Sequence, residues 1–319
     1  MEKRIVWLDW AKAIGIWLVV LGHLPFQGHS VLFYFHMPFF FILSGFLYKP
    51  IPLKDEIRKS AKRLLLPYCV YNAILLSLLL LTGDRSYWNA INMLLGNQNQ
   101  LPINCCAMWF LVALFVIRCL YSLVRYVNSW VIILGCVVLF CLSLYLNPAP
   151  VANDYLQLQT SLLCAPFFEF GYLANKQQLI MRMGGVKICK LILVVSMLVI
   201  GFLVAWWNGY TDTDDLTVNV FRCLYGRSLL LFYLSATAIS LALMILMSWF
   251  LTKRNRFVDD IAAETILIMA LHQTVIVSLI KYVPKNPLVC LLFSILIMTF
   301  FWGVIQVKHC SLWLKKKVS

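Results

Sequence analysis

Charged residues are scarce in this sequence. Asp, Glu, Lys and Arg make up 13% of its 319 residues, whereas apolar residues make up 62%. Soluble domains have about 25% charged and roughly 45–50% apolar residues, so a soluble globular protein is excluded. A disordered chain is excluded too, because aromatic residues reach 14% of the sequence and disordered segments have few of them. The composition predicts an all-α, multi-pass membrane protein embedded in a lipid bilayer.

Acidic residues are the scarcer of the two charged classes. The chain has 13 Asp and Glu against 27 Lys and Arg, which gives a formal net charge of +14. The basic residues are dispersed between apolar runs and form no basic domain, so nucleic acid is not an expected partner. Membrane topology explains them better, because Lys and Arg concentrate in cytoplasmic loops.

Metal-site and disulfide motifs are missing as well. The 11 cysteines are an odd number, most lie inside apolar runs, and no two are spaced as C-x-x-C. Zinc sites and disulfide frameworks both have characteristic cysteine spacings. We therefore expect neither, and no other metal site.

Apolar runs dominate the sequence instead. A transmembrane helix needs about 20 mostly apolar residues, and ten stretches approach or reach that length. No repeat or long polar linker divides them, so we expect one integral domain over residues 1–319. The stretches are 5–24, 31–48, 64–82, 107–124, 129–147, 159–175, 189–207, 227–251, 261–283 and 287–307.

The distribution of basic residues predicts the orientation. Ten spans place both termini on the same side of the membrane. With that side cytoplasmic, 20 of the 27 Lys and Arg lie in inner segments and five in outer loops. This asymmetry follows the positive-inside rule and makes the basic tail 308–319 cytoplasmic.

The inner segment Lys54–Pro67 has the pattern of an amphipathic helix. Its charges lie on one side, and Ile57, Ala61, Leu64 and Leu65 have helical spacing on the other. Such a helix lies in the membrane interface with its basic face toward the cytoplasm. Alternatively, these charges serve only to set the topology.

Lys12 and His23 share one face of the first predicted helix. They are eleven residues apart, which at 100° per residue is about 20° beyond three turns and at 1.5 Å per residue is a rise of about 16.5 Å. A cation near the cytoplasm and a deep imidazole then line one path through half of the bilayer. In the alternative interpretation, Lys12 pairs with Asp9 and His23 merely lies at the interface.

Further ionisable residues lie inside apolar stretches. Each costs at least about 2.5–3.5 kcal/mol at the bilayer centre, which makes it a functional candidate. His36 is predicted at a depth similar to His23, so the two imidazoles can meet. Arg118 and Glu169 are predicted to form an ion pair, with a role in structure or in holding a substrate. His272 lies in the ninth stretch.

Five segments stand in an order that resembles the membrane-bound acyltransferase 3 family. The resemblance is greatest to its fucose 4-O-acetylase-like branch and covers residues from about 6 to 275. Each segment alone is a weak signal, but their order and spacing together are specific. The segments are Leu8–His23, Phe35–Leu47, Lys62–Tyr68, Met108–Leu114 and Thr265–His272.

The resemblance implies a ten-helix enzyme of the cell membrane. Such enzymes take an acyl group, usually acetyl, from acyl-CoA at the cytoplasm and place it on a hydroxyl of a glycan or lipid-linked sugar. Acyl-CoA is then a co-substrate, and no cofactor is bound permanently. The acceptor and the oligomeric state do not follow from the resemblance.

The resemblance also implies roles for individual residues. His23 occupies the position of the family's proposed catalytic histidine, and Lys12 stands where the broad family has arginine, as in the fucose 4-O-acetylase-like branch. We expect His36 to assist His23. Candidates to stabilise the oxyanion are Trp109, His272 and the region of Ser44. Cations expected to attract the phosphates of acyl-CoA are Lys12, Arg58, Lys59, Lys62 and Arg63.

Two other classes of protein fit the composition. A small-molecule transporter or flippase also needs many helices and buried charges, but it gives no reason for the alignment of Lys12 with His23. Its paired discontinuous segments in corresponding halves are not found in the sequence. A non-catalytic membrane component of a polysaccharide assembly complex is the third possibility, and binding of acyl-CoA separates the enzyme from both.

Overall fold

The computed structural model describes residues 5–81, 91–92, 95–97, 107–147, 154–180, 187–210 and 216–318. Most of the chain is helical. The helices up to residue 176 are α1 (Val6–Gly22), α2 (Ser30–Phe33), α3 (His36–Phe46), α4 (Leu53–Ser60), the π-helical η1 (Ala61–Leu65), α5 (Leu66–Leu81), α8 (Trp109–Leu123), α9 (Ser129–Leu146), the 3₁₀ turn η3 (Tyr155–Gln157) and α10 (Leu158–Lys176).

The second half of the chain adds a small hairpin to the helices. The strands β1 and β2 pair antiparallel, with Val218 opposite Tyr225. The remaining elements are α11 (Lys187–Trp207), β1 (Val218–Asn219), η4 (Val220–Arg222), β2 (Leu224–Tyr225), α12 (Leu229–Phe250), α13 (Arg256–Ala263), α14 (Thr265–Leu279), η5 (Ile280–Tyr282) and α15 (Pro287–Val318).

Each of the ten predicted apolar stretches overlaps a helix, and the fold is that of a polytopic helical membrane protein. In the described part of the chain, four helical segments have the length and hydropathy to cross a membrane: Ser129–Leu146, Leu229–Phe250, Thr265–Tyr282 and Pro287–Ser311. Shorter apolar helical segments are Ser30–Phe46, Trp109–Leu123 and Leu191–Trp207. The count of ten spans and the side of the termini stay predictions.

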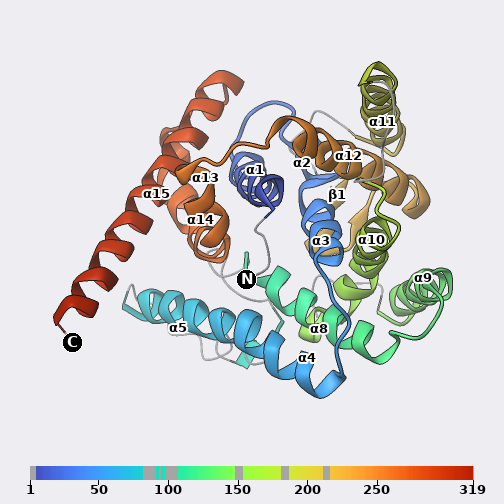
Figure 1. Cartoon of the computed structure of the whole chain (residues 1–319), viewed down its shortest axis with the longest axis horizontal. Helices are drawn as coiled ribbons and strands as arrows, with labels where there is room; N and C mark the ends of the chain where they lie inside the picture. The colour runs from blue at the N-terminus through green and yellow to red at the C-terminus, as the bar shows by residue number, and fades with distance from the viewer. Residues whose placement is uncertain are drawn as a thin grey trace.

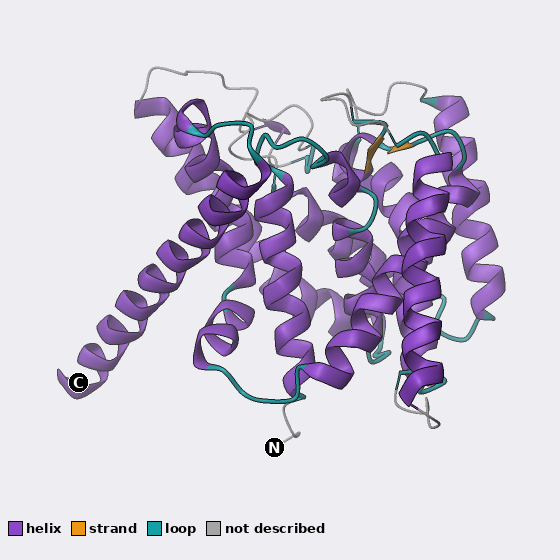
Figure 2. Cartoon of the chain, turned by 90° about the horizontal axis from the view of Figure 1, so that it is seen from above, coloured by secondary structure: helices purple, strands orange, loops and turns teal. Residues whose placement is uncertain are grey.

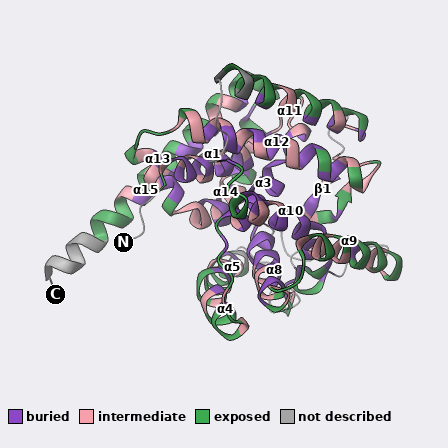
Figure 3. Ribbon diagram, turned by 45° about the vertical axis from the view of Figure 1, so that its right-hand side comes forward, coloured by how far each residue is buried: buried purple, intermediate pink, exposed green. Residues whose placement is uncertain are grey.

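Several helices run roughly parallel to one another in Figure 2, whereas α15, which leads to the C-terminus, is inclined to them. The beginning of α1 and the end of α15 lie at one edge of the molecule, and the β1–β2 hairpin lies at the opposite edge. Buried residues concentrate in α1, α3 and α10, whereas α9 and α11 are largely exposed (Figure 3). Because the exposed side chains of α9 are mainly large and apolar, this helix presents a surface suited to lipid.

The second predicted span, 31–48, is not one helix. It breaks at Phe35, which has φ −136° and ψ −20°, so that α2 and α3 are separate helices. Pro38 follows in the first turn of α3, where a missing backbone N–H costs nothing. His36 is therefore the first residue of α3 and not a residue five positions into a continuous helix.

Two glycines let α3 and α10 touch backbone to backbone (Figure 1). A Cβ atom built on Gly45 would overlap the carbonyl oxygen of Phe168, and one built on Gly171 would overlap that of Ile42. Small residues at such positions allow close helix packing in membranes, where no hydrophobic effect drives helices together. The contact fixes α3 against α10 and leaves no room for a larger side chain at either glycine.

Replacing Gly45 or Gly171 by alanine is expected to destabilise the protein. The added methyl group meets backbone atoms that cannot rotate away, so the free energy of unfolding falls by about 1–3 kcal/mol or more. Thermal unfolding of the purified protein in detergent measures the loss. Gly135→Ala is the matched control, because nothing lies within 4 Å of its Cβ position; an equal loss in the control would contradict the explanation.

Candidate functional site

Histidines from three helical regions gather around one phenylalanine. The ring of Phe33 lies 5.8 Å from that of His23 and 4.9 Å from that of His36, measured between centroids. The ring of His272 packs edge-on against His23, with centroids 5.0 Å apart. His29 joins the same group, 6.2 Å from Phe33. We call these four histidines the histidine cluster.

Each member of the cluster uses the same ring nitrogen to bind its own helix or turn. The Nδ1 atoms of His23, His36 and His29 lie 2.8, 2.6 and 2.9 Å from the carbonyl oxygens of Val19, Leu32 and Phe26. A carbonyl oxygen only accepts, so each Nδ1 carries the proton. The neutral imidazoles therefore present the lone pair of Nε2 to their surroundings.

His272 has the same tautomer but a more enclosed position. Its Nδ1 lies 2.9 Å from the carbonyl oxygen of Met269 and 3.1 Å from that of Ile268. Its Nε2 is buried and has no hydrogen-bond partner among the described residues. A buried polar atom without a partner is costly, so this nitrogen is placed to accept a hydrogen bond from a substrate group or a water molecule.

The elements around the cluster explain why these residues meet. His23 follows directly after the end of α1, and α1 packs on α3 through Gly15, which lies against the rings of Phe39 and Phe40. This contact brings the end of α1 beside the turn between α2 and α3. His272 comes from α14, which also packs on α1. His23 is half-buried, whereas His36 and His272 are buried.

The predicted meeting of His23 and His36 is modified by the structure. Both rings pack on Phe33, and the imidazole in contact with His23 is that of His272. Break-up of the second apolar stretch at Phe35 turns His36 toward the carbonyl of Leu32 and places Phe33 against both imidazoles. His29, which lies in a loop outside the predicted spans, was missed.

Lys12 and Asp9 form the predicted ion pair at the other end of α1, with Nζ and Oδ1 3.9 Å apart. The side chain of Lys12 stays 34% exposed, so it can reach a further anion. Since α1 is unbroken from Lys12 to Gly22, the helical register that relates Lys12 to His23 applies.

The predicted ion pair between Arg118 and Glu169 is wrong. Arg118 instead binds Glu56, with its Nε 2.7 Å from Oε1. Ser60 donates a second hydrogen bond to the same oxygen, and Arg118 also lies 5.3 Å above the ring of Tyr48. The partner lies 62 residues away in sequence, on the amphipathic segment, so the buried pair docks α4 onto α8.

The amphipathic segment is helical as predicted, and it packs on α8 with part of its predicted apolar side buried. Glu56, Ser60 and Leu64 are buried, whereas Ile57 is 42% exposed. The burial of Glu56 accompanies its pairing with Arg118. Four of the five cations expected to attract acyl-CoA lie on this segment. Lys59 is half-buried, and the exposed ones are Arg58, Lys62 and Arg63.

Three further candidates lie away from the histidine cluster. Trp109 packs 6.1 Å from Phe41 and 5.9 Å from Phe221, in an aromatic group between α3, α8 and η4. Glu169 is 1% exposed and lies toward the end of α10. Ser44 is half-buried beside Gly45. These positions support packing roles for Trp109 and Ser44 rather than a place beside His23.

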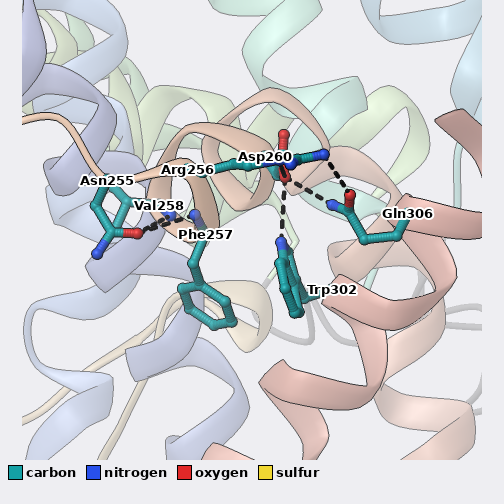
Figure 4. Close-up of polar contacts among 7 residues, drawn as sticks. All are labelled: Asn255, Arg256, Phe257, Val258, Asp260, Trp302 and Gln306. Atoms are coloured by element: carbon teal, nitrogen blue, oxygen red, sulfur yellow. Dashed lines mark hydrogen bonds and ion pairs between the residues drawn. The ribbon is translucent and has the colours of Figure 1, made fainter.

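A polar network anchors the helices that bear His272 (Figure 4). Asp260 Oδ2 on α13 accepts hydrogen bonds from Trp302 Nε1 (3.1 Å) and Gln306 Nε2 (2.7 Å) on α15. Glu264, at the joint between α13 and α14, pairs with Lys308 at 2.6 Å. The network holds the joint, and so α14 and His272, against α15.

Metal-binding geometry is not found in the described ranges, where no group of three or more His, Cys, Asp or Glu is placed to hold an ion. What the histidine cluster offers is a set of neutral imidazole bases in an apolar setting. Such groups accept a proton from a hydroxyl or attack an activated carbonyl.

Comparison with known proteins gives one match. The family model of the acyltransferase domain, of the acyltransferase 3 type, matches residues 5–307, which is nearly the whole chain. No curated protein and no solved structure matches. The fucose 4-O-acetylase-like branch is not distinguished by this match and stays a prediction.

Removal of Glu56 tests the corrected ion pair. Glu56→Gln leaves the guanidinium of Arg118 without a counter-charge, so we expect the free energy of unfolding to fall by roughly 2–4 kcal/mol, somewhat less than for a fully buried pair. Adding Arg118→Met to Glu56→Gln should restore part of the loss. Thermal unfolding of single and double variants gives the coupling energy. Glu169→Gln serves as the comparison; coupling of Arg118 to Glu169 instead of Glu56 would contradict the assignment.

Proposed function

The chain belongs to this family of acyltransferases, and from that premise we propose that it is an O-acyltransferase of the cell membrane. The donor is cytoplasmic acyl-CoA, with acetyl-CoA as the first choice. The acceptor is a hydroxyl of a glycan or lipid-linked sugar of the cell envelope. The observation that carries the proposal is the packing of His272 on His23, 5.0 Å apart, with Nδ1 of both rings bound to backbone carbonyls.

His23 supplies the reactive nitrogen in this proposal. With Nδ1 protonated, Nε2 removes the proton from the acceptor hydroxyl, and the oxygen attacks the thioester carbonyl. The tetrahedral intermediate collapses with loss of the CoA thiolate, which takes the proton back from the imidazolium. Alternatively, Nε2 attacks the thioester itself and carries the acyl group before the hydroxyl accepts it. Both routes use the same atom of the same residue.

His272 is placed to assist His23. Its Nε2 has a lone pair and no hydrogen-bond partner among the residues that the structure describes, so it accepts a hydrogen bond from the acceptor hydroxyl or from the imidazolium that forms on His23. In this tautomer it has no free donor for an oxyanion, and we therefore assign it a positioning role. His36 packs edge-on against Phe33, and this contact holds the ring that also packs on His23.

The donor approaches from the end of α1 that carries Lys12. The ammonium of Lys12, together with the exposed cations of α4 and η1, attracts the CoA phosphates. The rise of about 16.5 Å from Lys12 to His23 is a length that an extended pantetheine arm spans. The transporter alternative has no observation in the described residues that favours it.

Loss of His23 is expected to abolish transfer. In membranes that contain His23→Ala, the rate of transfer from labelled acetyl-CoA to endogenous glycans should fall by about 10²–10⁴-fold, because the proton acceptor is gone. His309→Ala, an exposed histidine on α15, is the control at matched abundance. Full activity in His23→Ala would overturn the assignment. Labelled protein trapped without acceptor would favour the acyl-carrier route.

Loss of Lys12 is expected to weaken donor binding. Lys12→Met removes one charge-assisted contact worth about 1.5–3 kcal/mol, so KM for acyl-CoA should rise about tenfold to hundredfold with a smaller change in kcat. Lys12→Arg should restore most of the affinity, because it keeps the charge. Lys281→Met, at the opposite end of the helices, is the control. A fall in kcat alone would place Lys12 elsewhere in the mechanism.

A further inference from the structure

Glu169 is a buried carboxylate in the described part of the chain. The residue is 1% exposed, and neither carboxylate oxygen has a hydrogen-bond partner among the described residues. The hydroxyls of Tyr121 and Ser129 lie near its carboxylate, and Tyr121 donates its proton to the carbonyl oxygen of Ala165 at 3.2 Å. An unpaired buried carboxylate is costly, so the site is incomplete without a cationic group.

A cavity adjoins this carboxylate. Its volume is about 40 Å³, and its walls include Glu169, Tyr48, Tyr172 and Ser129. The hydroxyl of Tyr48 is also buried without a partner. Three unpaired oxygens, two of Glu169 and one of Tyr48, therefore belong to the lining of one cavity. A primary ammonium has three N–H donors, and one water-sized group needs roughly 10–15 Å³ of such space, so an ammonium fits.

The cavity adjoins a wider groove. The groove has a volume of about 1150 Å³ and shares Arg125, Val127, Ser129 and Lys176 with the lining of the cavity. Arg125 is half-buried and Lys176 exposed, so two cations border the passage between cavity and groove. A ligand complementary to these charges has an ammonium at the end that enters the cavity and an anionic group at the border between cavity and groove.

The outer part of the groove is suited to a membrane lipid. Its rim includes Tyr126 and Trp130, which are 87% and 69% exposed, and Leu179, which is 47% exposed. Trp130 begins the exposed apolar surface of α9. Aromatic side chains at helix ends are typical of the membrane–water interface, and the basic residues beside them place this interface on the predicted cytoplasmic side.

We propose that the groove binds a phospholipid with a primary-amine headgroup, of the phosphoethanolamine class, with its ammonium on Glu169 and Tyr48 and its phosphate on Arg125 and Lys176. The site shares no lining residue with the histidine cluster. It is therefore independent of the acyl transfer proposed above. Trimethylated headgroups are excluded by the small cavity and by their lack of N–H donors.

Lipid binding to the purified full chain tests the site. Native mass spectrometry of the protein in detergent compares bound dioleoyl phosphatidylethanolamine, phosphatidylcholine and phosphatidylglycerol at equal concentrations. We expect occupancy by the ethanolamine lipid to exceed that of the other two several-fold. Equal occupancy by the ethanolamine and choline lipids would overturn the proposal. Displacement of bound lipid by free phosphoethanolamine at equal concentration would overturn the assignment of a lipid as the occupant.

Variants identify the groups responsible. Glu169→Gln should abolish the preference for the ethanolamine lipid, and Tyr48→Phe should reduce it while keeping the ring that Arg118 covers. Lys176→Ala should lower occupancy by all three lipids, because each has a phosphate. Arg254→Ala, an exposed cation outside the groove, is the matched control and should bind as the wild type. An undiminished preference in both Glu169→Gln and Tyr48→Phe would contradict the site; if Glu169→Gln does not fold, Tyr48→Phe decides.

Discussion

The close approach of α3 and α10 is the contact on which the rest of the structure depends. Gly45 and Gly171 each face a carbonyl of the opposite helix, so the two backbones touch where any side chain would separate them. Both candidate sites rest on this pair of helices. α3 begins with His36, a member of the histidine cluster. The segment after α3 carries Tyr48, and α10 carries Glu169. A shift of one helix along the other would displace both sites at once.

Polar groups in the apolar interior divide into those that are satisfied and those that are not. The histidines spend Nδ1 on backbone carbonyls, and Arg118 is neutralised by Glu56. These contacts make burial tolerable and need no further explanation. Nε2 of His272 and the carboxylate of Glu169 remain without partners in the described part of the chain. Because an unpaired polar group is costly in an apolar environment, these two side chains indicate sites at which the protein binds other molecules.

The two sites differ in the chemistry that they support. The histidine cluster combines lone pairs of fixed direction with a half-buried position at the end of α1, which suits proton transfer. The groove beside Glu169 combines charges of both signs with an exposed aromatic rim, which suits a zwitterionic headgroup. Membership of the acyltransferase family accounts for the first site. Nothing in acyl transfer requires the second.

The sequence by itself determined the class of protein, the helical stretches and the family. Composition excluded a soluble chain, and apolar length located the helices, since both depend only on local sequence. The pairing of Lys12 with Asp9 was also predictable, because three residues along a helix fix the distance. The tertiary structure alone decided that Arg118 binds Glu56 rather than Glu169, that Glu56 is buried in place of Ile57, and that His272 faces His23. Helical periodicity says which side chains share a face, but not which distant helix that face meets, and the meeting of helices is set by packing.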